Sequence, residues 1–225
     1  MFSAILFDLD GTLADTDPIH FQVWQEIFAG YGIECDRDFY QNHVSGNTNE
    51  RLIANVLPQL SPEAAKQLAW DKEAAYRAKA ETLQPMPGLE RVIELTAKIP
   101  LKRAAVTNAP KENAYHLLDA LKLRNILTTV VLAADAPPGK PDPAPYLLGL
   151  EKLGATAEEA IAFEDSPTGI TAAVAAGIYT IGITSTHSAA SLLGCGASMA
   201  IADFNSAELW QFFAKNFTGS AIASL

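Results

Sequence analysis

Short, fully apolar segments that alternate with helical patterns restrict the fold of this chain more than any other feature. Six such segments are expected to form strands: Ala4–Phe7, Arg103–Val106, Val130–Ala133, Ala160–Phe163, Tyr179–Ile183 and, more weakly, Met199–Ala202. Helical patterns lie between the later ones, at Leu89–Ile99, Glu112–Leu121, Pro143–Leu153 and Gly169–Ala176. Strands that are apolar on both sides are typical of a parallel sheet whose two faces are covered by helices. The sequence therefore predicts an α/β fold.

A helical insert interrupts this alternation directly after the first strand. Residues 16–85 contain no convincing strand, and the Asp-Pro pair at 17–18 is a start signal for a helix. A Pro-Met-Pro-Gly segment at 85–88 then returns the chain to the alternating pattern. We expect two domains: a parallel-sheet domain formed by residues 1–15 and 86–225, and an all-helical cap domain formed by residues 16–85.

The composition excludes several classes of protein. The formal net charge is −10 and no basic run offsets it, which argues against a general nucleic-acid surface. Cys35 and Cys195 are expected to be free thiols in a reducing compartment. The N-terminus lacks the basic region of a signal peptide, and no apolar stretch approaches the roughly 20 residues that span a bilayer. We expect a soluble, cytoplasmic monomer with no nucleic-acid and no membrane partner.

A pair of carboxylates stands directly after the first strand. Asp8 and Asp10 are two residues apart, so a continuing strand would point both side chains the same way, and Gly11 permits a tight turn behind them. Two unpaired carboxylates are costly in a purely structural role. The pair therefore predicts a metal-bound nucleophile with an acid/base partner, and two caps of a turn are the alternative.

Three further polar segments follow other predicted strands or lie shortly downstream of them. They are Val106-Thr107-Asn108, Gly139-Lys140-Pro141-Asp142 and Phe163-Glu164-Asp165-Ser166-Pro167. The carboxyl ends of parallel strands meet at one edge of a sheet, where ligands bind. Helices that begin at the Asp-Pro and Ser-Pro pairs would aim free N–H groups at this edge, which favours an anionic ligand. The alternatives are ordinary helix capping, a helix-terminal acidic pair and a solvated lysine.

Together with the first carboxylate pair, these segments resemble, in order, the four motifs of the haloacid dehalogenase-like hydrolase superfamily. The similarity is to its branch of phosphatases and β-phosphoglucomutases with a helical cap, and it covers nearly the whole chain. Within that branch, residues 103–114 look most like the plant-type broad-range sugar phosphatases. The resemblance implies a Rossmann-like core with a helical cap. It also implies Mg²⁺-dependent hydrolysis of small sugar or polyol phosphate monoesters through an aspartyl phosphate.

The resemblance also implies a role for each of the acidic motif residues. Asp8 would be the nucleophile and a metal ligand, and Asp10 would be the acid/base catalyst and bind the metal through its backbone carbonyl. Asp165 would complete the Mg²⁺ site, with Glu164 helping directly or through water. All of these ligands are oxygen atoms, which Mg²⁺ prefers.

Three polar residues of the middle motifs would bind the transferring phosphate. Thr107 and Asn108 would hold its oxygens through a hydroxyl, an amide or backbone N–H groups. Lys140 would supply a fixed cation for the same oxygens and for Asp8. Phosphate monoesters react very slowly unaided, so charge stabilisation must provide most of the catalysis.

The expected cap contributes candidate substrate-binding residues at His20, Gly46, Asn47, Asn49 and Lys72. A surface histidine and an exposed helix lysine are the alternatives for two of them. The β-phosphoglucomutases resembled here have an arginine where Asn49 stands, which grips a second phosphate. An asparagine cannot replace that charge, so the residue favours a hydrolase acting on monophosphates over a hexose phosphomutase.

A non-enzymatic alternative is a phospho-accepting signalling module, similar to a response-regulator receiver. Receivers also surround an Mg²⁺-bound aspartate with acidic residues, a threonine and a lysine. They are shorter, however, and carry no helical insert of roughly 70 residues after the first strand. The expected partner of this chain is therefore a small phosphorylated metabolite.

Overall fold

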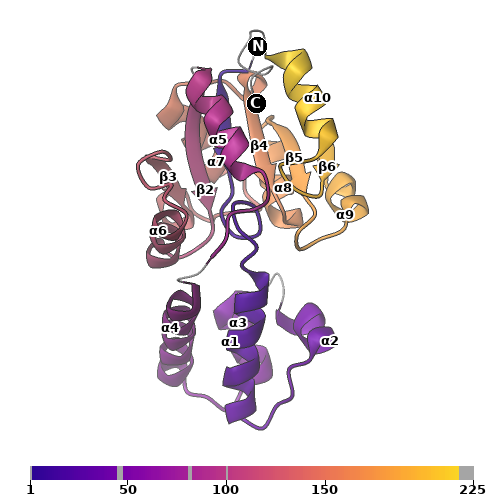
Figure 1. The fold of residues 1–225 in the computed structure, drawn as a ribbon. Coiled ribbons are helices and arrows are strands. Elements are labelled where there is room, and N and C mark those ends of the chain that lie inside the picture. Colours follow the sequence, from indigo (N-terminus) through magenta and orange to yellow (C-terminus); the bar gives the residue numbers. More distant parts are fainter. Residues whose placement is uncertain (1, 45–47, 81–82, 100, 218–225) are drawn as a thin grey trace. The chain divides into compact units, whose positions relative to one another are not determined.

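The computed structural model describes residues 2–44, 48–80, 83–99 and 101–217, which belong to two compact units (Figure 1). The sheet unit comprises Met1–Asp15 and Leu83–Leu225, and the helical unit comprises Thr16–Thr82. The sequence placed the second boundary slightly later, between residues 85 and 86. Each unit has its own hydrophobic core and is described by itself.

A six-stranded parallel sheet forms the centre of the sheet unit and confirms the predicted α/β class. Its strands are β1 (Ala4–Phe7), β2 (Lys102–Thr107), β3 (Thr129–Leu132), β4 (Ala160–Glu164), β5 (Tyr179–Ile183) and β6 (Met199–Ile201). Their order in the sheet is β3-β2-β1-β4-β5-β6. β1 is therefore central, and Phe7 is in register with Ala105 of β2 and Phe163 of β4. The strand order changes direction at β1, which is where α/β proteins bind ligands.

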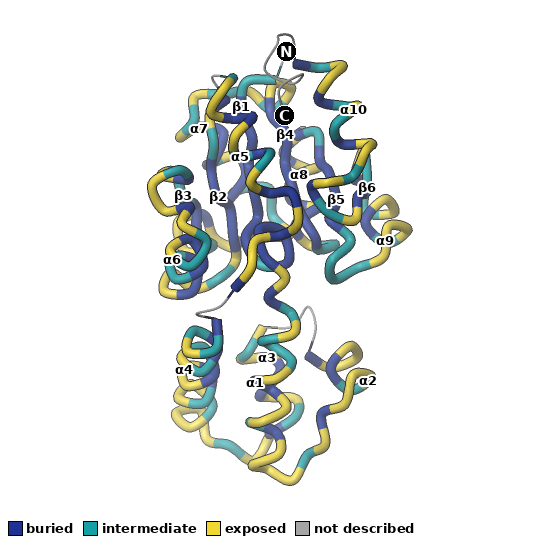
Figure 2. The backbone as a smooth tube through the Cα atoms, viewed as in Figure 1, coloured by how far each residue is buried: buried dark blue, intermediate teal, exposed yellow. Residues whose placement is uncertain are grey.

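Helices cover both faces of this sheet (Figure 1). They are α5 (Leu89–Lys98), α6 (Lys111–Ala120), α7 (Ala144–Leu153), α8 (Pro167–Ala175), α9 (Ala189–Gly194) and α10 (Ala207–Asn216), with 3₁₀ turns at Ala133–Asp135 and Ala157–Glu159. α7 packs on β1, β2 and β3, and α8 packs on β4 and β5. α5 and α10 lie on the opposite face. Because both faces are covered, the central strands are buried (Figure 2).

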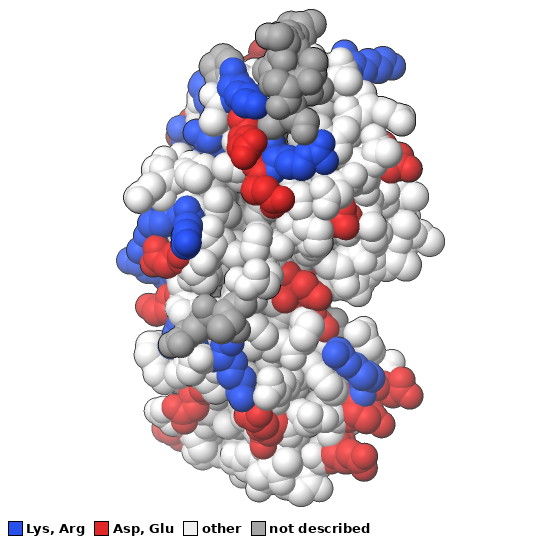
Figure 3. All heavy atoms as spheres, viewed as in Figure 1, with Lys and Arg blue, Asp and Glu red and all other residues white. Residues whose placement is uncertain are grey.

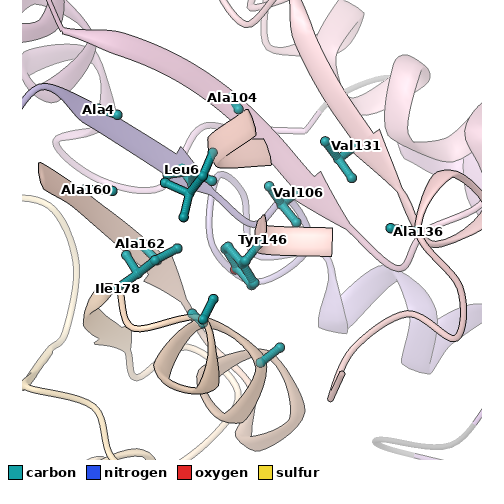
Figure 4. Close-up of a cluster of buried hydrophobic side chains, with 14 residues drawn as sticks. Ala4, Leu6, Ala104, Val106, Val131, Ala136, Tyr146, Ala160, Ala162 and Ile178 are labelled. Carbon is teal, nitrogen blue, oxygen red and sulfur yellow. The ribbon is translucent and has the colours of Figure 1, made fainter. Parts of the chain in front are cut away.

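The two faces of the sheet carry different side chains, since successive residues of a strand point to opposite sides. The face under α7 and α8 is lined by small and aliphatic residues around the ring of Tyr146 (Figure 4). The other face is aromatic: Phe7 stacks on Phe163 with ring centroids 5.4 Å apart, and Phe204 meets both rings edge-on. Small residues in β1, β2 and β4 let α7 approach the sheet closely enough to place Tyr146 near the strand ends.

The helical unit consists of α1 (Asp17–Gly30), α2 (Arg37–Phe39), a π-helical turn (Tyr40–Val44), α3 (Asn49–Val56) and α4 (Pro62–Lys79). Its core is built around Trp24 and Phe28, whose rings stack. The start of α1 differs from the expectation: Thr16, not Asp17, is the N-cap, and Asp17 instead accepts a hydrogen bond from the Tyr40 hydroxyl at 2.8 Å. Ser61 begins α4, where its hydroxyl accepts from the N–H of Ala64 at 3.2 Å.

The described helices include none that is both long enough and apolar enough to cross a membrane. On the face drawn in Figure 3, acidic and basic side chains are interspersed.

Candidate active site

The ammonium group of Lys140 is the centre of a buried cluster at the carboxyl ends of β1, β2 and β4. Its Nζ lies 2.6 Å from Oδ1 of Asp8, 2.5 Å from Oε1 of Glu164 and 2.7 Å from the carbonyl oxygen of Val106. Lys140 is only 8% exposed, so the solvated-lysine alternative is wrong. Three strands that are distant in sequence thus deliver one acceptor each to the same cation.

Glu164 is completely buried at the end of β4 and has both carboxylate oxygens bonded. Besides Lys140, Oε1 accepts from the Tyr146 hydroxyl at 2.8 Å. Oε2 accepts from the backbone N–H of Asp165 at 3.2 Å and from the Ser166 hydroxyl at 3.3 Å. This carboxylate is held rigidly, and its negative charge helps to fix the lysine.

Asp165 approaches the loop that follows Asp8. A Cβ atom on Gly11 would lie 2.1 Å from Oδ2 of Asp165, and Gly11 has a φ of +75°. Only glycine satisfies both the close approach and this backbone conformation. The Thr186 hydroxyl also hydrogen-bonds to Oδ2 of Asp165 and lies 3.2 Å from its carbonyl oxygen. The packing therefore keeps the Asp165 carboxylate beside Asp8.

The electrostatics of the cluster follow from its burial. Desolvation, together with the charges of Glu164 and Asp10, raises the pKa of Asp8 to about 7 against the opposing charge of Lys140. Desolvation also raises the pKa of Asp165, and the charge of Asp8 adds to the effect. Although burial alone would lower the pKa of Lys140, the charges of Asp8 and Glu164 raise it. Lys140 is therefore a permanent cation. Its single positive charge is too small to balance the negative charges of the carboxylates around it.

The acidic side chains of this cluster fit a divalent cation. One carboxylate oxygen each from Asp8, Glu164 and Asp165 lies within 4.8 Å of the others. When all three carboxylates are ionised, Lys140 balances one of their three negative charges. Two buried negative charges remain, which a bound Mg²⁺ would balance. Hard oxygen ligands are those that Mg²⁺ prefers. The charge of a bound metal ion would oppose the desolvation that raises the pKa values of Asp8 and Asp165.

Thr107 and Asn108 follow β2 at the same edge of the sheet. The Thr107 hydroxyl accepts from the N–H of Ala109 at 2.9 Å. The Asn108 amide pairs with the backbone of Lys140 through both of its polar atoms, at 3.1 and 3.0 Å. Asn108 therefore supports the lysine loop, a contact that the sequence did not suggest.

Asp10 remains next to the cluster but outside the strand. It forms a backbone bridge with Ala14, as part of the turn after β1, and is partly exposed. The turn keeps its carboxylate close enough to influence the charge state of Asp8.

Three of the expected cap residues meet within the helical unit. Lys72 is 4% exposed, so it is not a surface lysine. Its Nζ lies 3.0 Å from Nδ1 of His20 and 2.9 Å from Oε1 of Glu73. The same Glu73 oxygen accepts from the Asn49 amide at 2.5 Å. The His20 ring also stacks on the ring of Tyr76, with ring centroids 4.2 Å apart. Gly46 and Asn47, the other two candidates, lie outside the described residues.

Sequence reasoning missed Tyr146, Thr186 and Glu73. Tyr146 and Thr186 are single polar residues on a helix and in a loop, and their partners are 18 and 21 positions away. Glu73 follows the predicted Lys72 directly, so an acid beside a candidate substrate-binding lysine was a usable signal.

The chain thus combines a parallel sheet with an acidic, lysine-centred site at the carboxyl ends of its strands. Residues 5–183 match the family described as haloacid dehalogenase-like hydrolase, and the chain belongs to this family. This confirms the resemblance noted in the sequence at the level of the family.

The chain is similar to several known proteins, some of which are named for, or crystallised with, phosphorylated compounds. A phosphorylated carbohydrates phosphatase from Thermotoga maritima is 31% identical over 179 residues, which cover 79% of this chain and 83% of the relative. A family IA hydrolase structure from Entamoeba histolytica has a TM-score of 0.84 at 29% identity, covering 92% of this chain and 97% of that one. CbbY from Rhodobacter sphaeroides, in complex with xylulose-1,5-bisphosphate, has a TM-score of 0.77 at 26% identity, with coverages of 91% and 95%.

Proposed function

We propose that this protein is an Mg²⁺-dependent phosphatase that hydrolyses small sugar or polyol phosphate monoesters through an aspartyl phosphate on Asp8. The observation that carries the proposal is the buried contact of Lys140 with both Asp8 and Glu164, beside Asp165. A permanent cation and a cluster of carboxylates suit an anionic substrate that must approach an anionic nucleophile.

In the first step, an oxygen of Asp8 attacks phosphorus and the bond from phosphorus to the ester oxygen breaks. Asp10 protonates the departing sugar oxygen, and the phosphoryl group stays on Asp8. In the second step, Asp10 takes a proton from water, the water oxygen attacks phosphorus, and the bond to Asp8 breaks. When bound to Asp8, the Asp10 carbonyl and Asp165, with Glu164 nearby, Mg²⁺ would reduce the repulsion between the two anions.

The phosphate oxygens would be held by the residues at the carboxyl end of β2. Thr107 contributes its hydroxyl, and Asn108 contributes its backbone N–H while its amide maintains the loop of Lys140. Lys140 stabilises the charge that develops on the transferring group. Its contacts with Asp8 and Glu164 limit its freedom before substrate binds, so little reorganisation is required.

The helical unit would act as the cap that selects substrate, with the sheet unit as the catalytic domain. Asn49 lacks the charge needed to grip a second phosphate, and Glu73 pairs with Lys72 in the same cluster. A set of donors and acceptors in which the charge of Lys72 is balanced by Glu73 suits the hydroxyl groups of a monophosphate. We assign this role to His20, Asn49 and Lys72, together with Gly46 and Asn47. The similarity to the Thermotoga phosphatase supports the same class, as does the resemblance of residues 103–114 to plant-type sugar phosphatases.

A β-phosphoglucomutase-type hexose phosphomutase is the second candidate, because the same aspartyl phosphate could be passed to a sugar hydroxyl. The similarity to CbbY, which was crystallised with a sugar bisphosphate, is the observation that favours this candidate. We further propose that the enzyme works as a cytoplasmic monomer on a small metabolite. The two reactions differ in product, so one assay separates them.

The proposal is tested by measuring inorganic phosphate released from a panel of hexose, pentose and triose phosphates with Mg²⁺. Wild-type protein should release phosphate steadily without forming a sugar phosphate isomer, and Asp8→Asn should fold but lose essentially all turnover. Asp203→Asn, which changes an aspartate next to β6, is the matched control and should keep full activity. Normal phosphate release by Asp8→Asn would refute the assigned nucleophile, and dominant isomer formation would favour the mutase.

A further inference from the structure

The loop between β5 and α9 contacts the candidate metal site through one side chain, Thr186. Its hydroxyl bonds to Oδ2 of Asp165 and lies 3.2 Å from the carbonyl oxygen of the same residue. On its other side, the hydroxyl lies 2.9 Å from Nδ1 of His187. Neither Thr186 nor His187 belongs to the four motifs that the sequence presented.

The chemistry of a hydroxyl group sets the direction of these hydrogen bonds. An ionised carboxylate only accepts hydrogen bonds, and a threonine hydroxyl has a single hydrogen to donate. When Asp165 is ionised, that hydrogen must therefore go to Asp165, and Nδ1 of His187 must donate to the hydroxyl oxygen. His187 thus keeps the hydroxyl hydrogen directed at the carboxylate.

The loop that carries Thr186 is fixed at three places. The hydroxyl of Ser185 donates to the carbonyl oxygen of Gly11 at 2.5 Å, and the N–H of Thr184 donates to Ile201 at 2.9 Å. Ser188 caps α9 by accepting from the N–H of Ser191 at 3.2 Å. The Thr186 hydroxyl is therefore attached to a braced loop, so it can restrain the orientation of Asp165.

We propose that Thr186 is a positioning residue that orients the Asp165 carboxylate for binding of a divalent cation. The inference rests on the proposed function, since it assigns Asp165 as a metal ligand. Groups that orient metal ligands commonly change metal affinity when they are removed, by about 10- to 100-fold. One oxygen of Asp165 accepts from Thr186, which leaves the other oriented for the cation.

The test compares Thr186→Val, which removes the hydroxyl at similar volume, with Thr186→Ser, which retains it. Titration calorimetry with Mg²⁺ should show at least a roughly tenfold weaker Kd for the valine variant and a Kd within about twofold of wild type for the serine variant. In EDTA all three proteins should unfold cooperatively, with a lower unfolding temperature for the valine variant because the buried Asp165 loses a donor. Thr186→Ala removes the same hydroxyl and replaces the valine variant if that variant does not fold.

Two results would overturn the proposal. Wild-type Mg²⁺ affinity in Thr186→Val would show that the hydroxyl does not orient the ligand, and equal weakening in Thr186→Ser would assign the effect to the methyl group. If the wild-type protein hydrolyses phosphate esters with Mg²⁺ while Thr186→Val binds the ion unchanged, only this inference fails. If the wild-type protein binds no Mg²⁺, the metal-dependent function fails as well.

Discussion

Individual side chains at the strand ends combine structural and chemical tasks. Glu164 binds Lys140, the Tyr146 hydroxyl and the backbone of Asp165, and all of these contacts are buried. When one partner is removed, a buried charged group keeps fewer hydrogen bonds. The resulting loss in the free energy of unfolding is larger than the contribution of a solvent-exposed hydrogen bond. Residues that hydrogen-bond to these buried charged groups should therefore affect the stability of the protein as well as its activity.

Tyr146→Phe tests this expectation. The change removes the hydroxyl that donates to Glu164 at 2.8 Å while it preserves the ring at the centre of the core in Figure 4. We expect the free energy of unfolding to fall by about 1 to 3 kcal/mol in urea denaturation, because a buried carboxylate loses a donor. Tyr31→Phe is the control, since Tyr31 is 42% exposed, and it should change stability little. Equal effects of the two changes would contradict the argument.

The motif residues were predictable because each follows a strand that its apolar composition reveals. Asp8, Lys140, Glu164 and Asp165 lie together as the parallel topology required. The supporting residues were not predictable, because a lone Tyr146 or Thr186 resembles any other polar residue. Only the packing of α7 and of the loop after β5 brings these hydroxyls to the carboxylates.

At the scale of secondary structure, the position of helix α8 depends on Gly169, which has no side chain. A Cβ atom on Gly169 would lie 2.0 Å from the carboxylate of Glu164, so the first turn of α8 lies directly against this buried group. Ser166 caps the same turn by accepting from the N–H of Gly169 at 3.1 Å. The position of α8 and the orientation of Glu164 therefore depend on each other.

Gly169→Ala should be destabilising although alanine is the better helix former. Intrinsic propensity favours alanine by up to about 1 kcal/mol, whereas overpacking costs about 1 to 3 kcal/mol, so overpacking should dominate. Gly194→Ala in α9, where a Cβ meets nothing within 4 Å, should leave stability equal or slightly higher. Chemical denaturation of both variants decides the sign, and a stabilised Gly169→Ala would mean that Glu164 moves freely.

The predicted strands agree with β1 to β6 to within a few residues, because apolar runs between turn signals are a strong local pattern. The prediction omitted α10 (Ala207–Asn216), in which the polar residues Glu208, Gln211 and Lys215 interrupt the apolar ones. The π-helical turn at Tyr40–Val44 also has no local signal, since its geometry depends on packing within the helical unit.

For the molecule as a whole, the buried acidic site makes stability depend on pH. Asp8 has a pKa of about 7 in the folded protein without metal, against a reference value of 3.8. Between these values the folded state binds more protons than the unfolded state, so the free energy of unfolding falls as pH rises from about 4 to 7. Below that range the contribution is fully present, and above it the contribution is lost.

Urea denaturation of the wild-type protein and Asp8→Asn in EDTA, at a series of pH values, measures this effect. We expect the stability of the wild-type protein to fall relative to the variant by roughly 1 to 4 kcal/mol over the range. Mg²⁺ should restore most of the loss near pH 7.5, because the cation favours the ionised carboxylates. A stability difference that is constant with pH would contradict the predicted protonation.

The central place of β1 also has a consequence for biosynthesis. The ribosome translates this apolar strand before its neighbours in the sheet, β2 and β4, which end only at Thr107 and Glu164. A growing polypeptide on the ribosome must therefore shield Ala4–Phe7 until the residues of β2 and β4 have been translated, because exposed strands promote aggregation. The helical unit is made from consecutive segments and needs no such delay. We therefore expect β1 to join the sheet late in folding, although it precedes its neighbours in the chain.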